Sequence, residues 1–263
     1  MIVAGSQSQA LAAELAAVTD HGLAGVRYDT FPDGESLVEV DPDGADVGEA
    51  VVVAATTSAA AHVEVLQLQD AVRELGAETV TTVLPYMGYA RQDEAFETGQ
   101  PCSARAVARA VATGTDRVLV VNPHEPAVCD FFDVPATAVD AAPRLAEPLP
   151  ADLADPLFLS PDEGAIDLAR SVRDAYGAGE TDFFRKTRRS GTAVDIEPGD
   201  VTVTDRDIVV TDDIVATGTT TSEAVAVLAE RGAASVFVAC VHPVLVGNAR
   251  LALDRAGVER VVG

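Results

Sequence analysis

The chain has 263 residues, of which 48% are hydrophobic and 5% aromatic, and it contains no tryptophan. Its 42 acidic residues outnumber the 18 basic ones, and the net charge of −24 argues against binding to nucleic acids or to anionic membranes. No apolar run approaches the ~18 residues of a membrane span, and three scattered cysteines without a CxxC pair favour a reducing cytoplasm and argue against a zinc site.

Strand and helix signals alternate along the chain. The initial MIVAGSQSQA has no basic flank before its apolar residues, so a secretory signal is not expected. In the first half, EAVVVAAT, TVTTVL and DRVLVVN predict buried strands, and residues 59–76 and 103–112 predict helices between them. In the second half, LFLS, IVV and ASVFVACVH predict strands, with helices from residue 163 and from near Ser222. This alternation predicts an α/β fold with doubly wound, mostly parallel sheets.

The strand–helix pattern restarts after the proline-rich stretch EPLPADLADP. We therefore expect two domains, residues 1–148 and residues 149–263. Four polar loops follow predicted strands, namely PYMGYARQD, NPHEP, SPDEG and TDDIVATGTTT. Because ligands of open parallel sheets bind beyond the carboxyl ends of the strands, these loops predict the functional edge of each sheet.

The last of these loops has the clearest chemistry. Residues 216–221 lead into a predicted helix, and free backbone N–H groups at a helix start, with Gly218 for the bend and threonine hydroxyls nearby, can bind phosphate. Asp212 and Asp213 repel phosphate but can accept hydrogen bonds from sugar hydroxyls or hold Mg²⁺. A phosphate site beside hydroxyl acceptors indicates a phosphosugar. The alternative is a strand-end turn whose acids cap the helix.

Six motifs in order resemble those of the ribose-phosphate pyrophosphokinases, the phosphoribosyl pyrophosphate synthetases. They are FPDGE, LPYMGYARQD, VNPHEPAVCDFFDVP, LSPDEG, KTRRSG and VVTDDIVATGTTT. The last also resembles the phosphoribosyl pyrophosphate loop of the type I phosphoribosyltransferase fold. The likeness covers nearly the whole chain, and it implies two domains of that fold.

The resemblance implies transfer of the β,γ-diphosphoryl group of ATP to the 1-hydroxyl of ribose 5-phosphate, with Mg²⁺ as cofactor. The products would be phosphoribosyl pyrophosphate and AMP. Asp212 and Asp213 would bind the ribose hydroxyls. The 5-phosphate would bind Ala216, Thr217, Gly218, Thr219 and Thr220, and the nucleotide would contact Arg91, Gln92 and Asp93. For Arg91 the alternative is a surface ion pair.

In FPDGE, the Asp-Gly pair predicts a tight turn. In the resembling family this turn reaches a neighbouring subunit, where its aromatic stacks on adenine and its acids bind the edge of the base. Phe31, Asp33 and Glu35 match those positions. The resemblance therefore implies a homo-oligomer.

The remaining implied groups are a metal site and a basic loop. His124 and Asp162 match metal-contacting positions, although His124 could be structural and SPDEG also predicts a helix N-cap at Asp162. His21, His62 and His242 are interpreted as structural.

Lys186 is the only lysine in the chain. With Arg188 it would form a mobile catalytic loop that neutralises the charge of the transferred phosphates. The alternative is a solvated basic hairpin. A surface with many dispersed acidic residues and almost no lysine is typical of proteins adapted to high salt.

Some residues depart from the family pattern. Asn122 stands where many relatives have Asp, Glu94 and Glu97 fall in a stretch that is often basic, and Ala216 replaces a polar or acidic residue. Relatives also usually continue beyond GVERVVG. Two other functions stay open at this point: a phosphoribosyltransferase that consumes phosphoribosyl pyrophosphate, and a non-catalytic regulatory subunit that resembles the synthetase.

Overall fold

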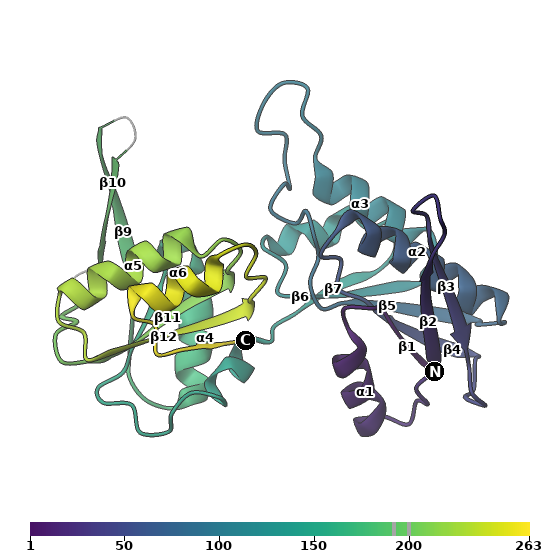
Figure 1. Cartoon of the computed structure of the whole chain (residues 1–263), viewed down its shortest axis with the longest axis horizontal. Coiled ribbons are helices and arrows are strands. Elements are labelled where there is room, and N and C mark those ends of the chain that lie inside the picture. Colours follow the sequence, from purple (N-terminus) through teal and green to yellow (C-terminus); the bar gives the residue numbers. More distant parts are fainter. Residues whose placement is uncertain (191–192, 199–200) are drawn as a thin grey trace. The chain divides into compact units, whose positions relative to one another are not determined.

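Buried runs of valine, alanine and leucine form the central strands of two separate parallel sheets. The computed structural model describes residues 1–190, 193–198 and 201–263. These residues form two compact units, Met1–Val139 and Asp140–Gly263 (Figure 1). Within the described residues, no helix combines the length and apolar composition that a membrane span would need.

The first unit is built on a five-stranded sheet with the strand order β1-β4-β5-β6-β7, in which every neighbouring pair is parallel. The β2–β3 hairpin stands apart as a two-stranded sheet. The elements of this unit are β1 (Ile2–Ala4), α1 (Gln9–Val18), β2 (Gly25–Thr30), β3 (Ser36–Asp41), β4 (Glu49–Val53), α2 (Ala59–Glu74), β5 (Thr79–Leu84), α3 (Ser103–Ala112), β6 (Arg117–Val121), η1 (Pro126–Phe131) and β7 (Ala136–Val139).

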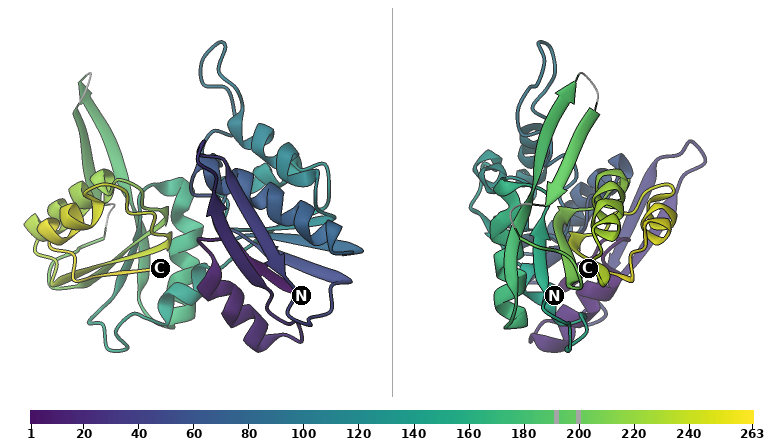
Figure 2. Two further views of the ribbon diagram at one scale, coloured as in Figure 1. Left: turned by 45° about the vertical axis from the view of Figure 1, so that its right-hand side comes forward. Right: turned by 90° about the vertical axis from the view of Figure 1, so that its left-hand side faces the viewer.

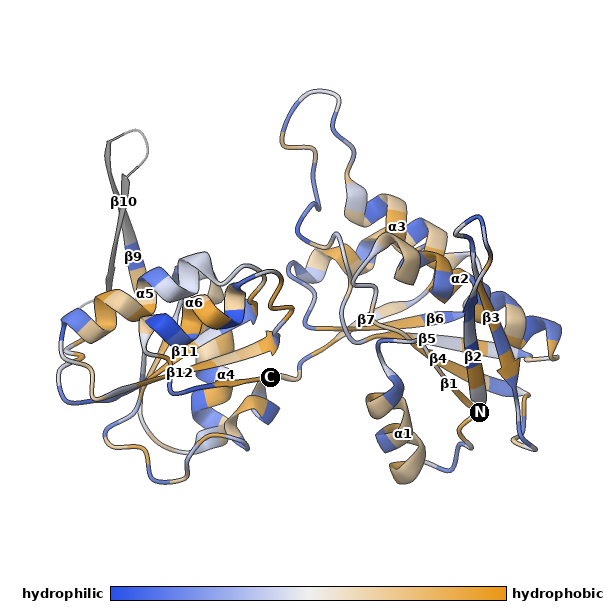
Figure 3. Cartoon of the chain, in the orientation of Figure 1, coloured by the Kyte–Doolittle hydropathy of each residue, from blue (hydrophilic) through white to orange (hydrophobic). Residues whose placement is uncertain are grey.

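Both faces of the first sheet pack against helices. Val65 and Leu68 of α2, with Ala108 of α3, join the large core on one face. Ala12 of α1 packs with Ile2 and Val53 on the other face, and Figure 1 shows α1 on the opposite side of the sheet from α2 and α3. These helices combine hydrophobic and hydrophilic residues (Figure 3), as helices do when one side covers a sheet and the other meets solvent.

The second unit contains a six-stranded sheet with the order β10-β9-β8-β11-β12-β13, parallel except for the β9–β10 pair. From the central strand β8, the chain goes to β9 on one side and later returns to β11 on the other. The elements are η2 (Ala142–Ala146), β8 (Leu157–Ser160), η3 (Glu163–Ala165), α4 (Ile166–Tyr176), β9 (Glu180–Ser190), β10 (Ala193–Pro198), β11 (Asp207–Ile214), α5 (Thr219–Glu230), β12 (Ser235–His242), α6 (Ala249–Ala256) and β13 (Arg260–Val262).

The helices of the second unit also cover both faces of its sheet. Leu228 of α5 and Leu253 of α6 pack on one face, whereas Val172 of α4 and Leu145 of η2 pack on the other (Figure 2). The prediction of an α/β fold with parallel sheets is therefore confirmed in both units. The reversal of strand order belongs to the second unit, because the strands of the first sheet follow one another in chain order.

Three boundaries differ from the sequence-based expectation. The units divide after Val139 rather than after residue 148, because Leu145 and Leu149 pack with Phe158 in the core of the second unit. Helix α5 starts at Thr219, ahead of Ser222. The segment around residue 186, expected as a loop, forms the β9–β10 hairpin, whose strands pair antiparallel from Phe184 to Ser190; its catalytic role stays a prediction.

Candidate active site

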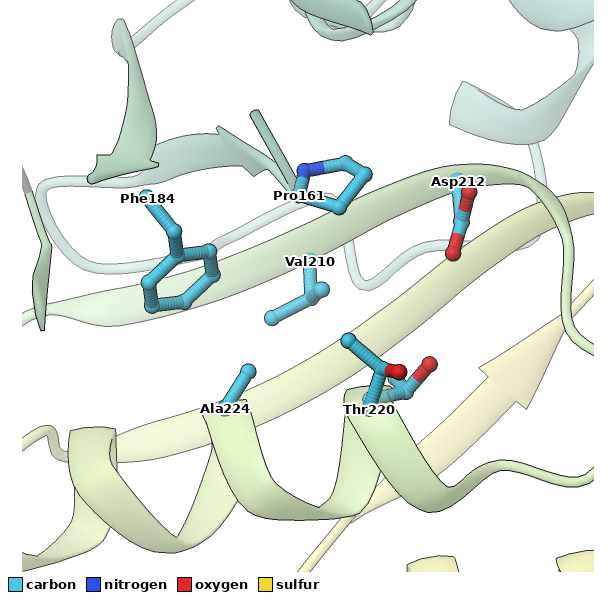
Figure 4. A pocket seen from close by; sticks show the side chains of 7 residues that line it. Pro161, Phe184, Val210, Asp212, Thr220 and Ala224 are labelled. Carbon is cyan, nitrogen blue, oxygen red and sulfur yellow. The ribbon is translucent and has the colours of Figure 1, made fainter. Parts of the chain in front are cut away.

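The carboxyl ends of β8 and β11 lie side by side in the second unit, and the chain leaves them in opposite directions. Such a switch point opens a crevice between the two following loops. A pocket lies there, lined by residues from the loop after β8, from β9, from β11 and from the start of α5 (Figure 4). Its lining residues are Pro161, Phe184, Val210, Asp212, Thr220, Thr221 and Ala224. Figure 4 shows Asp212 and Thr220 at one end and Phe184 at the other, so the pocket has a polar end and an apolar end.

The two adjacent carboxylates belong to the end of β11 rather than to the loop after it. Asp212 and Asp213 are half-buried. Oδ1 of Asp212 accepts a hydrogen bond from the amide of Asp213 (2.9 Å), and Oδ1 of Asp213 accepts one from the amide of Ile214 (2.8 Å). Each carboxylate is therefore oriented by the backbone of the next residue.

The loop after β11 turns its amides and its carbonyls to different sides. The carbonyls of Val215 and Ala216 accept hydrogen bonds from the amides of Leu245 (3.1 Å) and Val246 (2.9 Å). In the described part of the chain, no protein acceptor is found for the backbone N–H groups of residues 216–221. Consecutive N–H groups of this kind at a helix N-terminus form an anion-binding cradle.

Gly218 supplies the bend that the cradle requires. Its φ of +72° lies in the left-handed region, and its carbonyl accepts the amide of Ser222 (2.8 Å) to start α5. Side-chain hydroxyls gather at the same point, since the Oγ1 atoms of Thr217 and Thr219 lie 3.2 Å apart. The sequence-based prediction of a phosphate loop therefore agrees with the local geometry.

A buried thiol supports this segment from the neighbouring strand. Cys240 lies opposite Asp212 in the β11–β12 register. Its Sγ accepts the amide of Val215 (3.1 Å) and donates to the carbonyl of Asp213 (3.5 Å). Burial, with a contribution from the Asp212 carboxylate, raises the pKa of Cys240 to about 12. The thiol is therefore neutral and serves to link strands, not as a nucleophile.

The loop after β8 holds Asp162. The hydroxyl of Ser160, which is fully buried, donates to the carbonyl of Asp162 (2.7 Å) and so fixes the backbone there. Asp162 is exposed and precedes η3, and its side chain makes no capping hydrogen bond. Asp162 therefore occupies the N-cap position of η3, but its side chain does not cap the helix.

In the first unit, the long loop after β5 is anchored to the loop after β4. The amide of Gly88 donates to Oγ1 of Thr56 (2.9 Å), and a Cβ at Gly88 would lie 2.2 Å from the carbonyl oxygen of Thr56. Only glycine fits this approach. Tyr89 follows with φ of +65°, and the amide of Gln92 donates to its carbonyl (2.9 Å). Residues 88–92 therefore form a defined turn.

The three residues expected to contact the nucleotide differ in their surroundings. Arg91 is exposed, whereas Gln92 and Asp93 are half-buried. The side-chain oxygen of Gln92 accepts the hydroxyl of Ser103 at the start of α3. The carbonyl of Asp93 accepts the thiol of Cys102 (2.9 Å). Gln92 and Asp93 thus tie the turn to α3, and Arg91 extends from it.

His124 lies in the turn after β6, which neighbours β5 in the parallel sheet. Its side chain is exposed, and Asn122 before it has a positive φ of +35° and an amide that donates to the carbonyl of Val139 (3.0 Å). Because β5 and β6 are parallel neighbours, the turn that carries Arg91 and the turn that carries His124 share the carboxyl edge of the first sheet.

The predicted turn in FPDGE is confirmed at the tip of the β2–β3 hairpin. The amide of Phe31 donates to the carbonyl of Glu35 (2.7 Å), and Oδ1 of Asp33 accepts the amide of Glu35 (3.2 Å). Phe31 is 47% exposed, so nearly half of a large aromatic side chain is left accessible at the tip. The hydroxyl of Tyr28 donates to the carbonyl of Ala4, so the tip continues past the carboxyl end of β1.

Lys186 and Arg188 lie in β9, where they pair with Ile196 and Val194 of β10. The structure describes their backbone but not their side chains.

Comparisons with known proteins cover almost the entire chain. Residues 1–114 match the N-terminal domain of ribose phosphate pyrophosphokinase, and residues 140–262 match the phosphoribosyl transferase domain. A ribose-phosphate pyrophosphokinase of Halobacterium salinarum is 64% identical over 263 residues, which is 100% of this chain and 92% of that protein. One of Methanothermobacter thermautotrophicus is 40% identical over 265 residues, which is 100% of this chain and 92% of that protein.

The chain belongs to the ribose-phosphate pyrophosphokinase family.

A solved structure of this family supports the same conclusion. The phosphoribosylpyrophosphate synthetase from Mycobacterium smegmatis superposes with a TM-score of 0.82 at 29% identity, covering 99% of this chain and 87% of that one. The phosphoribosyl transferase match begins at residue 140, which is also where the second unit begins. The predicted type I phosphoribosyltransferase fold and the predicted enzyme family are therefore confirmed.

Ribose-phosphate pyrophosphokinases are expected to use Mg²⁺. Among the described residues, no group of three or more His, Cys, Asp or Glu side chains could hold a metal ion by itself. His124 and Asp162 also belong to different units. The donors nevertheless fit Mg²⁺, because the carboxylates of Asp212 and Asp213 adjoin an anion cradle, and Mg²⁺ is usually held by one or two carboxylates together with substrate phosphates.

Sequence reasoning missed the residues that support the family's loops from neighbouring elements. Thr56 anchors the turn at Gly88, and Cys240 links the ends of β11 and β12. Neither residue lies in a motif, and each contact joins positions that are at least 25 residues apart. The strand pattern of ASVFVACVH gives no signal for this role of Cys240, because a buried cysteine packs equally well as a small apolar residue.

Proposed function

We propose that the chain transfers the β,γ-diphosphoryl group of ATP to the 1-hydroxyl of ribose 5-phosphate. The single observation that carries this substrate assignment is the set of N–H groups at residues 216–221, which have no acceptor among the described residues and follow directly after two oriented carboxylates. Amides attract a phosphate, and carboxylates accept hydroxyl hydrogen bonds, so a sugar phosphate satisfies both in one orientation.

In this proposal the phosphate of ribose 5-phosphate occupies the cradle, and Asp212 and Asp213 receive its ribose hydroxyls. The 1-hydroxyl oxygen forms a bond to the β-phosphorus of ATP. The bond from the β-phosphorus to the oxygen bridging the α- and β-phosphates breaks, and AMP leaves with that oxygen. The proton of the 1-hydroxyl passes to solvent or to a nearby carboxylate. Phosphoribosyl pyrophosphate, AMP and the released proton together contain every atom of the two substrates.

The nucleotide side of the site is assigned to the first unit. Arg91 would bind the phosphates, since its guanidinium is permanently charged and planar, and Gln92 and Asp93 would hold the turn that presents it. Phe31, Asp33 and Glu35 would contact adenine in a neighbouring subunit, because the hairpin tip leaves nearly half of the Phe31 side chain accessible. This assignment requires a homo-oligomer.

His124 and Asp162, together with the paired carboxylates, would hold Mg²⁺, which supplies charge neutralisation for the phosphates when bound. Lys186 and Arg188 would add cationic donors to the transferred group. Charge stabilisation of this kind is the main contribution to phosphoryl transfer. All three cysteines are free, which accords with a reducing cytoplasm as the proposed location.

The test is to incubate the purified protein with ATP, Mg²⁺ and ribose 5-phosphate in molar KCl and to separate the nucleotides by chromatography. We expect stoichiometric AMP and phosphoribosyl pyrophosphate. Lys186→Ala is the matched variant, and we expect its turnover to fall by at least ~10²-fold, the scale of losing one transition-state donor, with ribose 5-phosphate binding retained. Formation of ADP, or binding of both substrates without any AMP, would overturn the proposal.

A further inference from the structure

His62 lies in the first turn of α2, beneath the turn that carries Arg91. Its ring packs against the ring of Tyr89, with centroids 5.4 Å apart and planes inclined by 39°. Its Nε2 also lies 3.1 Å from the point that a Cβ on Gly88 would occupy. The imidazole therefore contacts two consecutive residues of the turn, three and two positions before Arg91.

The imidazole makes no polar interaction that would explain its presence. Nδ1 and Nε2 are both buried, and neither has a hydrogen-bond partner among the described residues. Burial lowers the pKa of His62, so the ring is neutral at physiological pH. A buried polar ring without hydrogen bonds is less stable than an apolar ring of the same shape. What His62 supplies at this position is accordingly a flat aromatic surface.

The turn above His62 needs a support of this kind. Its start is fixed by the hydrogen bond from Gly88 to Thr56, and its end by the side-chain contact of Gln92 with Ser103. Between these anchors, Tyr89 has a positive φ and is 50% exposed. For a tyrosine this backbone conformation is strained and persists only where its surroundings hold it. The ring of His62 is the aromatic contact that Tyr89 makes in the described structure.

We propose that His62 is a positioning residue for the nucleotide, whose ring holds Tyr89 and thereby keeps the turn in the conformation that presents Arg91. The inference rests on the proposed function, since it assumes that ATP binds beside this turn. It assigns the role to ring packing and not to hydrogen bonding, because neither ring nitrogen has a hydrogen-bond partner in the part of the chain that the structure describes. Sequence reasoning had interpreted His62 as merely structural.

The decisive comparison is between two substitutions at this position. His62→Ala removes the ring, and we expect its KM for ATP to rise about 3- to 10-fold, which corresponds to the usual contribution of one aromatic pair. The KM for ribose 5-phosphate should change less than twofold. His62→Phe keeps a ring and removes the unpaired nitrogens, so it should restore the KM for ATP and raise the thermal midpoint above that of the wild type.

Val63→Ala is the matched control, because Val63 is exposed in the same turn of α2. It should leave both KM values unchanged.

Calorimetric binding of a non-hydrolysable ATP analogue gives a readout that does not depend on turnover. His62→Ala with a lowered thermal midpoint but wild-type affinity for the analogue would overturn the inference. So would rescue by His62→Asn and not by His62→Phe. If the wild-type protein bound the analogue but formed no AMP, the proposed function would be wrong. The role of His62 would then be judged from the analogue affinities of the wild type and of His62→Ala.

Discussion

At the residue scale, the candidate site depends on a few backbone conformations that only particular side chains permit. Gly218 has a positive φ where the phosphate loop meets α5, and Gly88 lies too close to Thr56 for any Cβ. The carboxylates of Asp212 and Asp213 are in turn oriented by the amides that follow them. The chemistry of the site therefore rests on main-chain geometry as much as on the side chains that would touch the substrates.

Gly218→Ala tests this dependence. An L-residue in the left-handed region costs ~1–2 kcal/mol, and the new methyl group would lie 3.4 Å from the carbonyl oxygen of Ala249. We expect the loop to shift and the KM for ribose 5-phosphate to rise about tenfold, equivalent to ~1.4 kcal/mol. Gly232→Ala is the control, because Gly232 also has a positive φ (+81°) but lies at the far end of α5. Both variants should lose stability, and an equal rise in KM for both would contradict the argument.

At the element scale, Asp116 links the starts of two parallel strands to α2. Its Oδ2 accepts the amide of Val80 at the start of β5 (2.7 Å) and the guanidinium of Arg73 near the end of α2 (2.6 Å). The opposite ends of β5 and β6 carry the turns with Arg91 and His124. The contacts of Asp116 therefore hold the amino ends of these two strands and the end of α2 together.

The acid titration of Asp116 gives a testable pH dependence. The amide of Val80, with a further contribution from Arg73, lowers the pKa of Asp116 below that of the unfolded chain. The unfolded state then binds the proton more tightly, so this stabilisation is complete above the unfolded pKa of ~3.9 and is lost as the pH falls through the folded value.

We therefore expect Asp116→Asn to lower the free energy of unfolding at pH 7, and the difference from wild type to shrink as the pH falls below ~4. Denaturant unfolding at several pH values measures this difference. Asp70→Asn, which alters an exposed acid on α2, is the control for net charge. A difference that stayed constant with pH would show that the carboxylate of Asp116 is not responsible.

At the scale of the whole molecule, charge is the dominant feature. The formal net charge is −24, and Arg accounts for every basic residue except Lys186. Such a surface repels itself at low ionic strength, and salt reduces that repulsion. That the surface is adapted to high salt stays a prediction from the sequence.

We expect the thermal midpoint to rise steadily as KCl increases from 0.1 M to 1 M, because the screening length falls from ~10 Å to ~3 Å over that range. Differential scanning calorimetry measures the midpoint, and sucrose at equal osmolality separates screening from solvent exclusion. A midpoint that is unchanged or lower in 1 M KCl would refute the interpretation of the acidic surface.

Much of the fold and of the site could be predicted from the amino acids alone. The alternation of apolar strands with amphipathic helices predicted two parallel α/β sheets, and the Asp-Gly pair predicted the turn at residues 31–35. The candidate site residues Arg91, His124, Asp162 and Asp212 can be proposed from the sequence because their signals are local: each belongs to a short polar motif at or just after the end of an apolar strand.

Only the tertiary structure decided which of these local pieces meet. The adjacency of β8 and β11, the link from Cys240 to Val215 and the packing of His62 beneath Tyr89 all join residues far apart in the sequence. The same is true of the unit boundary, which follows from the packing of Leu145 on Phe158 and not from the proline-rich stretch. The hydrophobic periodicity of a segment indicates which face of a helix or strand is buried, but not which other element packs against that face. The packing partner depends on the relative free energies of all the arrangements that the whole chain could adopt.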